Sequence, residues 1–235
     1  MKFLCLCIGL LAVGTPSIES QTRKPERPII CIDPGHPSEI SDGFQRLNGT
    51  SETHENWVVA QRLKEILVER GFRVIMTKSR EKQVVTNVAR AGIANKNHVL
   101  LMLRLHCDTG SGTGYRVFYP DTQAKDGKVT GPPIQVQRAS KVAADALHSG
   151  LLEKLADSLK DNGIKSDRST AVGTKMGGAL VGSIHSKVPV TLVEMVFLNN
   201  PKDAAFIKSE AGKEKMAQGL AEGVRRFVER DASRP

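Results

Sequence analysis

Aromatic residues and long basic runs are both scarce in this chain, which argues against nucleic acid as its partner. Only 4% of the 235 residues are aromatic, with two Tyr and one Trp, so no platform for stacked bases is evident. No run of Lys and Arg reaches five residues, although the formal net charge is +9. A basic chain of this kind suits anionic partners such as cell-wall polymers or lipid headgroups. We therefore expect no nucleic-acid partner.

Long hydrophobic runs are also lacking, apart from one near the N-terminus. Residues 3–13 are apolar and follow Lys2, which is typical of a secretory signal peptide and too short to span a bilayer. We predict a signal peptide over residues 1–20 and a polar tail over residues 21–27. The mature protein is then exported, to the periplasm or the extracellular space. No transmembrane segment is expected in the mature chain, because no other run reaches membrane-spanning length.

Cysteine is scarce as well, and two of the four cysteines lie in the predicted leader. Export would permit a disulfide between the remaining two, Cys31 and Cys107. We expect two small buried thiols instead, because Cys31 lies inside an apolar strand and Cys107 follows another. The chain also contains no Gly-x-Ser-x-Gly elbow and no phosphate-binding loop. Serine-hydrolase and nucleotide-dependent activities therefore lack support.

What the chain does contain is a regular alternation of apolar runs and amphipathic segments. This alternation predicts a single α/β domain over residues 28–231, with a mainly parallel twisted sheet and helices on both faces. Strands are expected at 28–33, 73–77, 99–105, 115–119 and 190–195. Helices are expected at 52–70, 86–97, 139–162, 203–208 and 213–230. An exposed loop is expected at 120–137, and irregular structure at 165–187.

Two histidines follow predicted buried strands. His36 comes after an Asp-Pro-Gly turn, and His106 ends the run Leu-Arg-Leu-His. In open parallel sheets the ligand site lies outside the carboxyl ends of the strands, and neutral imidazole is a common zinc ligand. We therefore predict a zinc site at this edge. Glu52, His54 and Glu55 cluster at the start of the first helix, and residue type alone does not choose the third ligand among them.

Glu194 is the candidate general base. It lies near the end of an apolar strand, where a carboxylate costs free energy unless it is paired, metal-bound or functional. Burial also raises the pKa of a carboxyl group, as a general base requires. His185, in the preceding loop, is a candidate for contacting substrate or transition state, with a plain surface position as the alternative.

Four segments, in order, resemble the zinc-dependent N-acetylmuramoyl-L-alanine amidases of the bacterial cell wall, the amidase-3 family. Residues 32–36, Ile-Asp-Pro-Gly-His, are similar to the family's opening motif, whose His binds zinc. Glu52, eight residues before Ala60, is similar to the ligand Glu of its helix motif. Residues 105–108 stand where the family usually has Ile-His-x-Asn. Residues 189–200 resemble its closing motif, whose Glu is catalytic.

The resemblance implies a zinc ion held by His36, Glu52 and His106, with Glu55 as the fallback ligand. It implies that Glu194 is the catalytic residue. The implied reaction is hydrolysis of the amide bond between N-acetylmuramic acid and L-alanine, and the implied partner is peptidoglycan or its muropeptide fragments. The sequence identifies no activator protein.

The chain also departs from the family pattern. Arg104 stands where the family usually has a small Ser, and Asp108 stands where it has Asn. These departures bear on the substrate more than on the metal. Arg104, like His185, is a candidate contact to a substrate carboxylate or a developing oxyanion. Two alternative functions stay open at this point: a zinc peptidase acting on wall peptides, and a catalytically inactive wall-binding module on the same fold.

Overall fold

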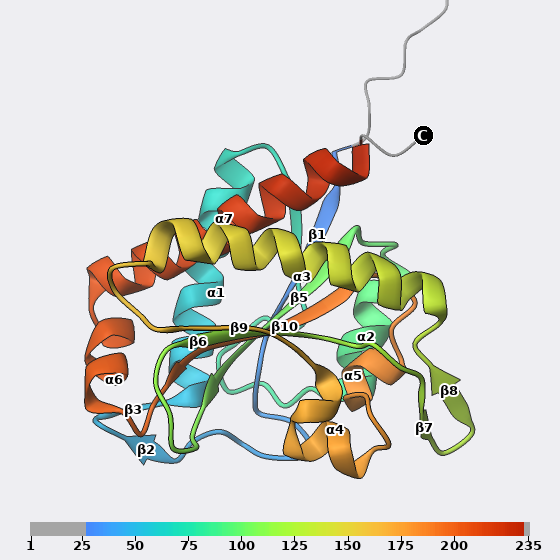
Figure 1. Ribbon diagram of the computed structural model, residues 1–235, viewed down its shortest axis with the longest axis horizontal. Coiled ribbons are helices and arrows are strands. Elements are labelled where there is room, and N and C mark those ends of the chain that lie inside the picture. The colour runs from blue at the N-terminus through green and yellow to red at the C-terminus, as the bar shows by residue number, and fades with distance from the viewer. Residues whose placement is uncertain (1–26, 233–235) are drawn as a thin grey trace, which may run out of the picture.

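The structure is a computed structural model that describes residues 27–232 (Figure 1). The predicted signal peptide, and all but the last residue of the predicted tail, lie outside this range. The strands are β1 (Ile29–Pro34), β2 (Arg46–Leu47), β3 (Thr50–Ser51), β4 (Arg73–Met76), β5 (Leu101–Asp108), β6 (Tyr115–Tyr119), β7 (Ala124–Asp126), β8 (Val129–Gly131), β9 (Asp161–Ser166) and β10 (Val190–Phe197). The helices are α1 (Glu52–Glu69), α2 (Asn87–Lys96), α3 (Ile134–Leu155), α4 (Ala171–Lys175), α5 (Val181–Ile184), α6 (Pro201–Lys208) and α7 (Glu210–Ala232), with a 3₁₀ turn at Asp167–Ser169. Among these described helices, none has both the length and the apolar character needed to cross a membrane.

Six strands form one sheet in the order β4-β1-β5-β10-β6-β9. The first four are mutually parallel, β6 runs antiparallel to β10, and β9 runs parallel to β6. The prediction of a mainly parallel sheet is therefore confirmed. One consequence is that the carboxyl ends of β1, β5 and β10 meet at a single edge of the sheet.

Helices cover both faces of the sheet, as predicted (Figure 1). On one face α1, α3 and α7 pack against the strands in the main hydrophobic core, and on the other α2 packs in a smaller cluster. Strand β1 shows how the sequence serves both faces: Ile30 and Ile32 belong to the main core, and Cys31 between them belongs to the smaller cluster. Three successive apolar residues that face alternate sides are the pattern of a strand buried on both faces. Cys31 and Cys107 are both buried free thiols, as expected.

Helices α3 and α7 cross at very short range because glycines occupy the contact. A Cβ added at Gly150 would lie 2.5 Å from the carbonyl oxygen of Gly219 and 2.8 Å from the Cα of Gly223. No side chain fits into that space, so the two backbones touch. This contact joins the last helix of the chain firmly to the middle of the domain.

Two local predictions were wrong, and both errors lie beyond β6. The predicted helix at 139–162 ends at Leu155, and Asp161–Ser166 forms the edge strand β9. The sequence Asp-Asn-Gly-Ile-Lys-Ser has little intrinsic strand propensity, so its order comes from pairing with β6. The predicted exposed loop at 120–137 contains the hairpin β7–β8, which turns at Gly127 and Lys128, and the first turn of α3.

Candidate active site

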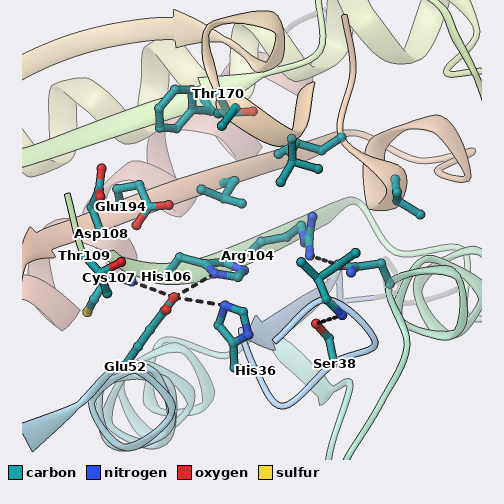
Figure 2. A pocket seen from close by; sticks show the side chains of 18 of the residues that line it. His36, Ser38, Glu52, Arg104, His106, Cys107, Asp108, Thr109, Thr170 and Glu194 are labelled. Carbon is teal, nitrogen blue, oxygen red and sulfur yellow. Dashed lines mark hydrogen bonds and ion pairs between the residues drawn. The ribbon is translucent and has the colours of Figure 1, made fainter. Parts of the chain in front are cut away.

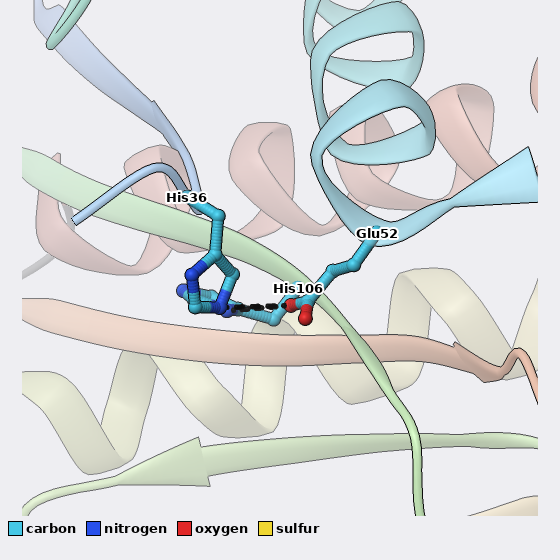
Figure 3. Close-up of side chains that lie close together, drawn as sticks. All are labelled: His36, Glu52 and His106. Atoms are coloured by element: carbon cyan, nitrogen blue, oxygen red, sulfur yellow. Dashed lines mark hydrogen bonds and ion pairs between the residues drawn. The ribbon is translucent and has the colours of Figure 1, made fainter. Parts of the chain in front are cut away.

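Three side chains from distant parts of the chain converge at the carboxyl edge of the sheet (Figure 3). His36 follows β1, Glu52 is the first residue of α1, and His106 lies near the end of β5. Glu52 Oε1 lies 3.3 Å from His36 Nε2 and 3.0 Å from His106 Nδ1. One ligand atom from each residue falls within 4.8 Å of the others. The prediction that these three residues lie close together is therefore confirmed.

The Asp-Pro-Gly turn brings His36 to this point. The amide of Gly35 donates a hydrogen bond of 2.8 Å to the carbonyl of Leu105, which joins the turn to β5. A Cβ at Gly35 would lie 2.6 Å from His106 Nδ1, so only glycine lets the turn lie against that imidazole. His36 itself has a φ of 53°, in the left-handed region that non-glycine residues seldom adopt.

The donor atoms of this cluster fit a metal centre. His36 donates from Nδ1 to the carbonyl of Ser41 at 2.9 Å, which leaves the Nε2 lone pair facing Glu52. Burial lowers the pKa of His106 to about 4 despite its contact with Glu52, so this imidazole is neutral, and its buried Nε2 has no hydrogen-bond partner. Burial alone would raise the pKa of Glu52, but His106 and His36 outweigh it and hold the pKa well below its usual range. Burial alone would lower the pKa of His36, but its hydrogen bond with Glu52 and the charge of that carboxylate outweigh burial and raise the pKa. Two imidazoles and one carboxylate are a ligand set found in catalytic zinc sites.

Glu194 lies on β10 next to this cluster and points into the same cavity (Figure 2). It is paired in register with His106 on β5, and its buried Oε2 has no hydrogen-bond partner. Burial raises the pKa of Glu194 well above the usual range, and the negative charges of Glu52 and Asp108 raise it further. The carboxylate is thus placed and tuned to accept a proton.

The cavity that holds these groups has a volume of about 470 Å³. It is lined by residues of β5, β10 and β6, of the loop that carries His36, and of the segment around α4 and α5. Its lining includes His36, Glu52, His106, Glu194 and Arg104, which are five of the residues singled out from the sequence. A cavity of this size is in the range of small-molecule binding sites.

Arg104 lines this cavity, but its guanidinium is held by protein groups. Its Nε donates to Asp33 Oδ2 at 2.9 Å, and its Nη2 donates to Asn87 Oδ1 at 2.5 Å. Asp33 also accepts hydrogen bonds from Arg90 Nη1 at 2.6 Å and from Thr77 Oγ1 at 2.5 Å. This buried network was missed from the sequence, where Asp33 was assigned only to a turn. The available signal was an Asp that directly follows the apolar run Ile-Ile-Cys-Ile, where a carboxylate is costly to bury without a partner.

The two remaining sequence candidates lie elsewhere. Glu55 is buried on the same helix as Glu52, but it accepts a hydrogen bond from Thr50 and lies outside both the ligand cluster and the cavity lining. His185 caps the end of α5, where its Nε2 lies 2.9 Å from Asp126 Oδ2, and it does not line the cavity. The structure gives no support to the metal role considered for Glu55 or to the substrate contact considered for His185.

The fold and the site define a class: α/β proteins with a candidate catalytic metal centre at the carboxyl ends of parallel strands. The sequence pattern of the Amidase_3 family, N-acetylmuramoyl-L-alanine amidase, matches residues 30–226. The chain therefore belongs to this family.

Relatives and solved structures agree with this assignment. The chain is 28% identical to the N-acetylmuramoyl-L-alanine amidase Rv3717 of Mycobacterium tuberculosis, over 93% of this chain and 95% of the relative. It is 25% identical to the amidase AmiC of Neisseria meningitidis, over 93% of this chain and 57% of AmiC. The fold is similar to that of the amidase Ami1 from Mycobacterium smegmatis, with a TM-score of 0.69 at 20% identity, covering 86% of this chain and 97% of Ami1.

Proposed function

We propose that this chain is a zinc-dependent N-acetylmuramoyl-L-alanine amidase, which hydrolyses the amide bond between N-acetylmuramic acid and L-alanine in peptidoglycan. The observation that carries the proposal is the convergence of two imidazoles and a carboxylate beside Glu194, in one cavity of an amidase-family fold. The names of the relatives support the choice of substrate.

His36, Glu52 and His106 would hold the zinc ion, which supplies a Lewis acid that polarises a carbonyl and acidifies water. Ser41 orients His36 through its Nδ1 hydrogen bond. The backbone amide of Cys107 donates to Glu52 Oε1 at 3.3 Å and helps to orient the carboxylate.

Glu194 moves the proton in this mechanism. It removes a proton from the attacking water as the new carbon–oxygen bond forms, and it delivers that proton to the leaving nitrogen as the carbon–nitrogen bond breaks. The products are a carboxylic acid on the lactyl group of the sugar and a peptide with a free L-alanine amino terminus. The raised pKa of Glu194 supports this role, because the group must hold a proton near neutral pH between the two steps.

The test is to digest isolated peptidoglycan with the purified mature chain and to identify the released material by mass spectrometry. We expect intact stem peptides that begin with L-alanine, no release in the presence of a chelator, and recovery when zinc is added. Cleavage within the stem peptides would instead identify a peptidase. Binding to the wall without any release would identify a wall-binding module. Either result would overturn the proposal.

Glu194→Gln tests the assigned base. Turnover should fall by about 10²- to 10⁴-fold, the usual contribution of a general base, while zinc content stays at the wild-type level. Glu55→Gln is the matched control, since it also neutralises a buried carboxylate but lies outside the cavity, and it should retain both zinc and turnover. Wild-type turnover in Glu194→Gln would show that another group is the base.

We also propose that the protein works outside the cytoplasmic membrane, because residues 1–20 have the pattern of a signal peptide. The mass of the protein recovered from the periplasm or the medium should correspond to a chain that begins near residue 21. Full-length protein confined to the cytoplasm would contradict this location.

A further inference from the structure

Three arginines line the catalytic cavity, and the donors of two are already engaged by the protein. Arg90 bonds to Asp33 and to the carbonyls of Pro34, Pro37 and Val85. Arg104 bonds to Asp33 and to Asn87, as described above. Neither guanidinium has its charge free for a ligand, because both share the carboxylate of Asp33.

Arg116 is different. Its guanidinium lies near the rings of Phe118 and Phe197, at 5.7 Å and 5.6 Å from their centroids, which is within cation–π range. Its Nε is buried and has no hydrogen-bond partner. Within residues 27–232, no carboxylate forms an ion pair with Arg116. The charge of Arg116 lowers the pKa of the neighbouring Glu194, although burial dominates there, but no ion pair joins the two side chains. A guanidinium that lines a cavity without an ion-paired carboxylate is suited to an anionic group of a ligand.

The sheet register places Arg116 with respect to the reaction centre. Glu194 on β10 pairs with His106 on one side and with Arg116 of β6 on the other, so the three residues form one row across adjacent strands. Neighbouring strands lie about 4.8 Å apart, so Arg116 is about 10 Å from His106 along the row, measured between backbones. Glu194 and Arg116 occupy adjacent positions, and both line the cavity.

We propose that Arg116 binds a carboxylate of the stem peptide, that of the residue after L-alanine, and so selects substrates in which this group is free and not amidated. This inference rests on the proposed amidase function. The peptide side of the scissile bond must face Arg116, because the carboxyl group of the muramic acid is consumed in that bond. A peptide extends by about 3.5 Å per residue, so the second residue lies about 7 Å from the scissile bond, within reach of a side chain in this row.

The test uses two synthetic substrates that differ in one group. Both are N-acetylmuramoyl-L-alanyl-D-glutamate with the γ-carboxyl blocked as a methylamide, and the α-carboxyl is free in one and amidated in the other. The zinc-loaded wild type should hydrolyse the free acid with a kcat/KM about 10- to 100-fold higher, as expected for a hydrogen bond to a charged group. The same comparison on peptidoglycan with free or amidated α-carboxyl groups covers the case in which only the polymer is cleaved.

Arg116→Gln should lower kcat/KM for the free acid to the level of the amide, mainly through KM, and leave the amide nearly unaffected. Arg116→Lys should retain part of the preference, because it keeps the charge but loses the planar fork. Arg138→Gln is the matched control: it removes the same charge from an exposed position on α3, outside the cavity, and should preserve the preference.

The outcomes separate the two proposals. Hydrolysis of both substrates with no preference, or an equal loss on both in Arg116→Gln, would overturn the role of Arg116 and leave the amidase assignment standing. No hydrolysis of either substrate or of peptidoglycan would refute the amidase function and, with it, the inference drawn from it.

Discussion

Asp33 is the centre of a buried charge network whose Arg90 and Arg104 line the cavity, and Asp33→Asn tests how strongly that network stabilises the fold. The side chain is fully buried between Arg90 and Arg104, whose side chains are 1% and 4% exposed. Asn preserves the size of the side chain but removes its charge. Two buried guanidiniums then lose the only carboxylate that forms an ion pair with either of them in the described part of the chain.

The expected loss of stability is large because both partners stay buried. Removing one member of a buried ion pair costs about 3–5 kcal/mol, since an uncompensated charge remains in the interior. Asn can still accept hydrogen bonds, which places the expected loss near the lower end of that range. With a total stability of about 5–15 kcal/mol for a domain, the variant should still fold.

The effect should depend on pH in a defined direction. Burial alone would raise the pKa of Asp33, but Arg90, Arg104 and Thr77 outweigh it and hold the pKa well below its ordinary value of 3.8. A carboxyl group with a lowered pKa stabilises the folded protein fully above the unfolded value, and this stabilisation declines as the pH falls toward the folded value. The difference between wild type and Asp33→Asn should therefore be constant near neutral pH and shrink below about pH 4.

Urea unfolding in the presence of chelator measures this difference without a contribution from bound metal. Glu214→Gln is the control, since Glu214 pairs with Arg62 at the surface and its loss should cost less than about 1 kcal/mol. A loss below about 1 kcal/mol in Asp33→Asn, or a difference that is equal at pH 7 and pH 3, would show that the network does not stabilise the fold as described.

Two further predictions concern packing and helix capping. Gly150→Ala should gain up to about 1 kcal/mol of helix propensity but lose more stability through the clash with Gly219 and Gly223. Calorimetry should therefore show a lower melting temperature, and an unchanged or higher one would refute the close α3–α7 contact. Thr86→Ala should destabilise the protein by about 1 kcal/mol in urea unfolding, because the Thr86 side chain accepts a hydrogen bond from the Ala89 amide at the start of α2. Thr86→Ser should recover most of this loss. An equal loss in both variants would contradict a capping role for Thr86.

The central strands and the meeting of His36 and His106 could be predicted because their signals are local. Apolar runs such as Ile29–Pro34 are strands in any plausible α/β arrangement, and a parallel sheet brings their carboxyl ends together. His36 and His106 follow from that rule alone. The rule did not identify Glu52, because residue type alone does not choose the third ligand among Glu52, His54 and Glu55. Family resemblance favoured Glu52, and the structure shows that Glu52 meets the histidines whereas Glu55 contacts Thr50.

What could not be predicted depends on contacts between distant segments. Strand β9 has a polar, glycine-containing sequence and gains its order from the neighbouring strand β6. The sequence likewise suggested Arg104 as a substrate contact, whereas Arg116 was not singled out. The difference between them lies in their partners: Asp33 and Asn87 engage Arg104, and no carboxylate pairs with Arg116 among the described residues. Partners of this kind are set by tertiary packing and have no signature in local sequence.

The proposed zinc centre is tested most directly by the zinc content of dialysed protein. Elemental mass spectrometry measures this content in the wild type and in three variants: His36→Ala, Glu52→Ala and His106→Ala. We expect about one zinc ion per wild-type chain and a clear loss of zinc in each variant, while circular dichroism shows that all three variants remain folded. A wild type that retains no zinc after loading, or variants that all keep a full complement, would contradict a metal centre built from these three residues.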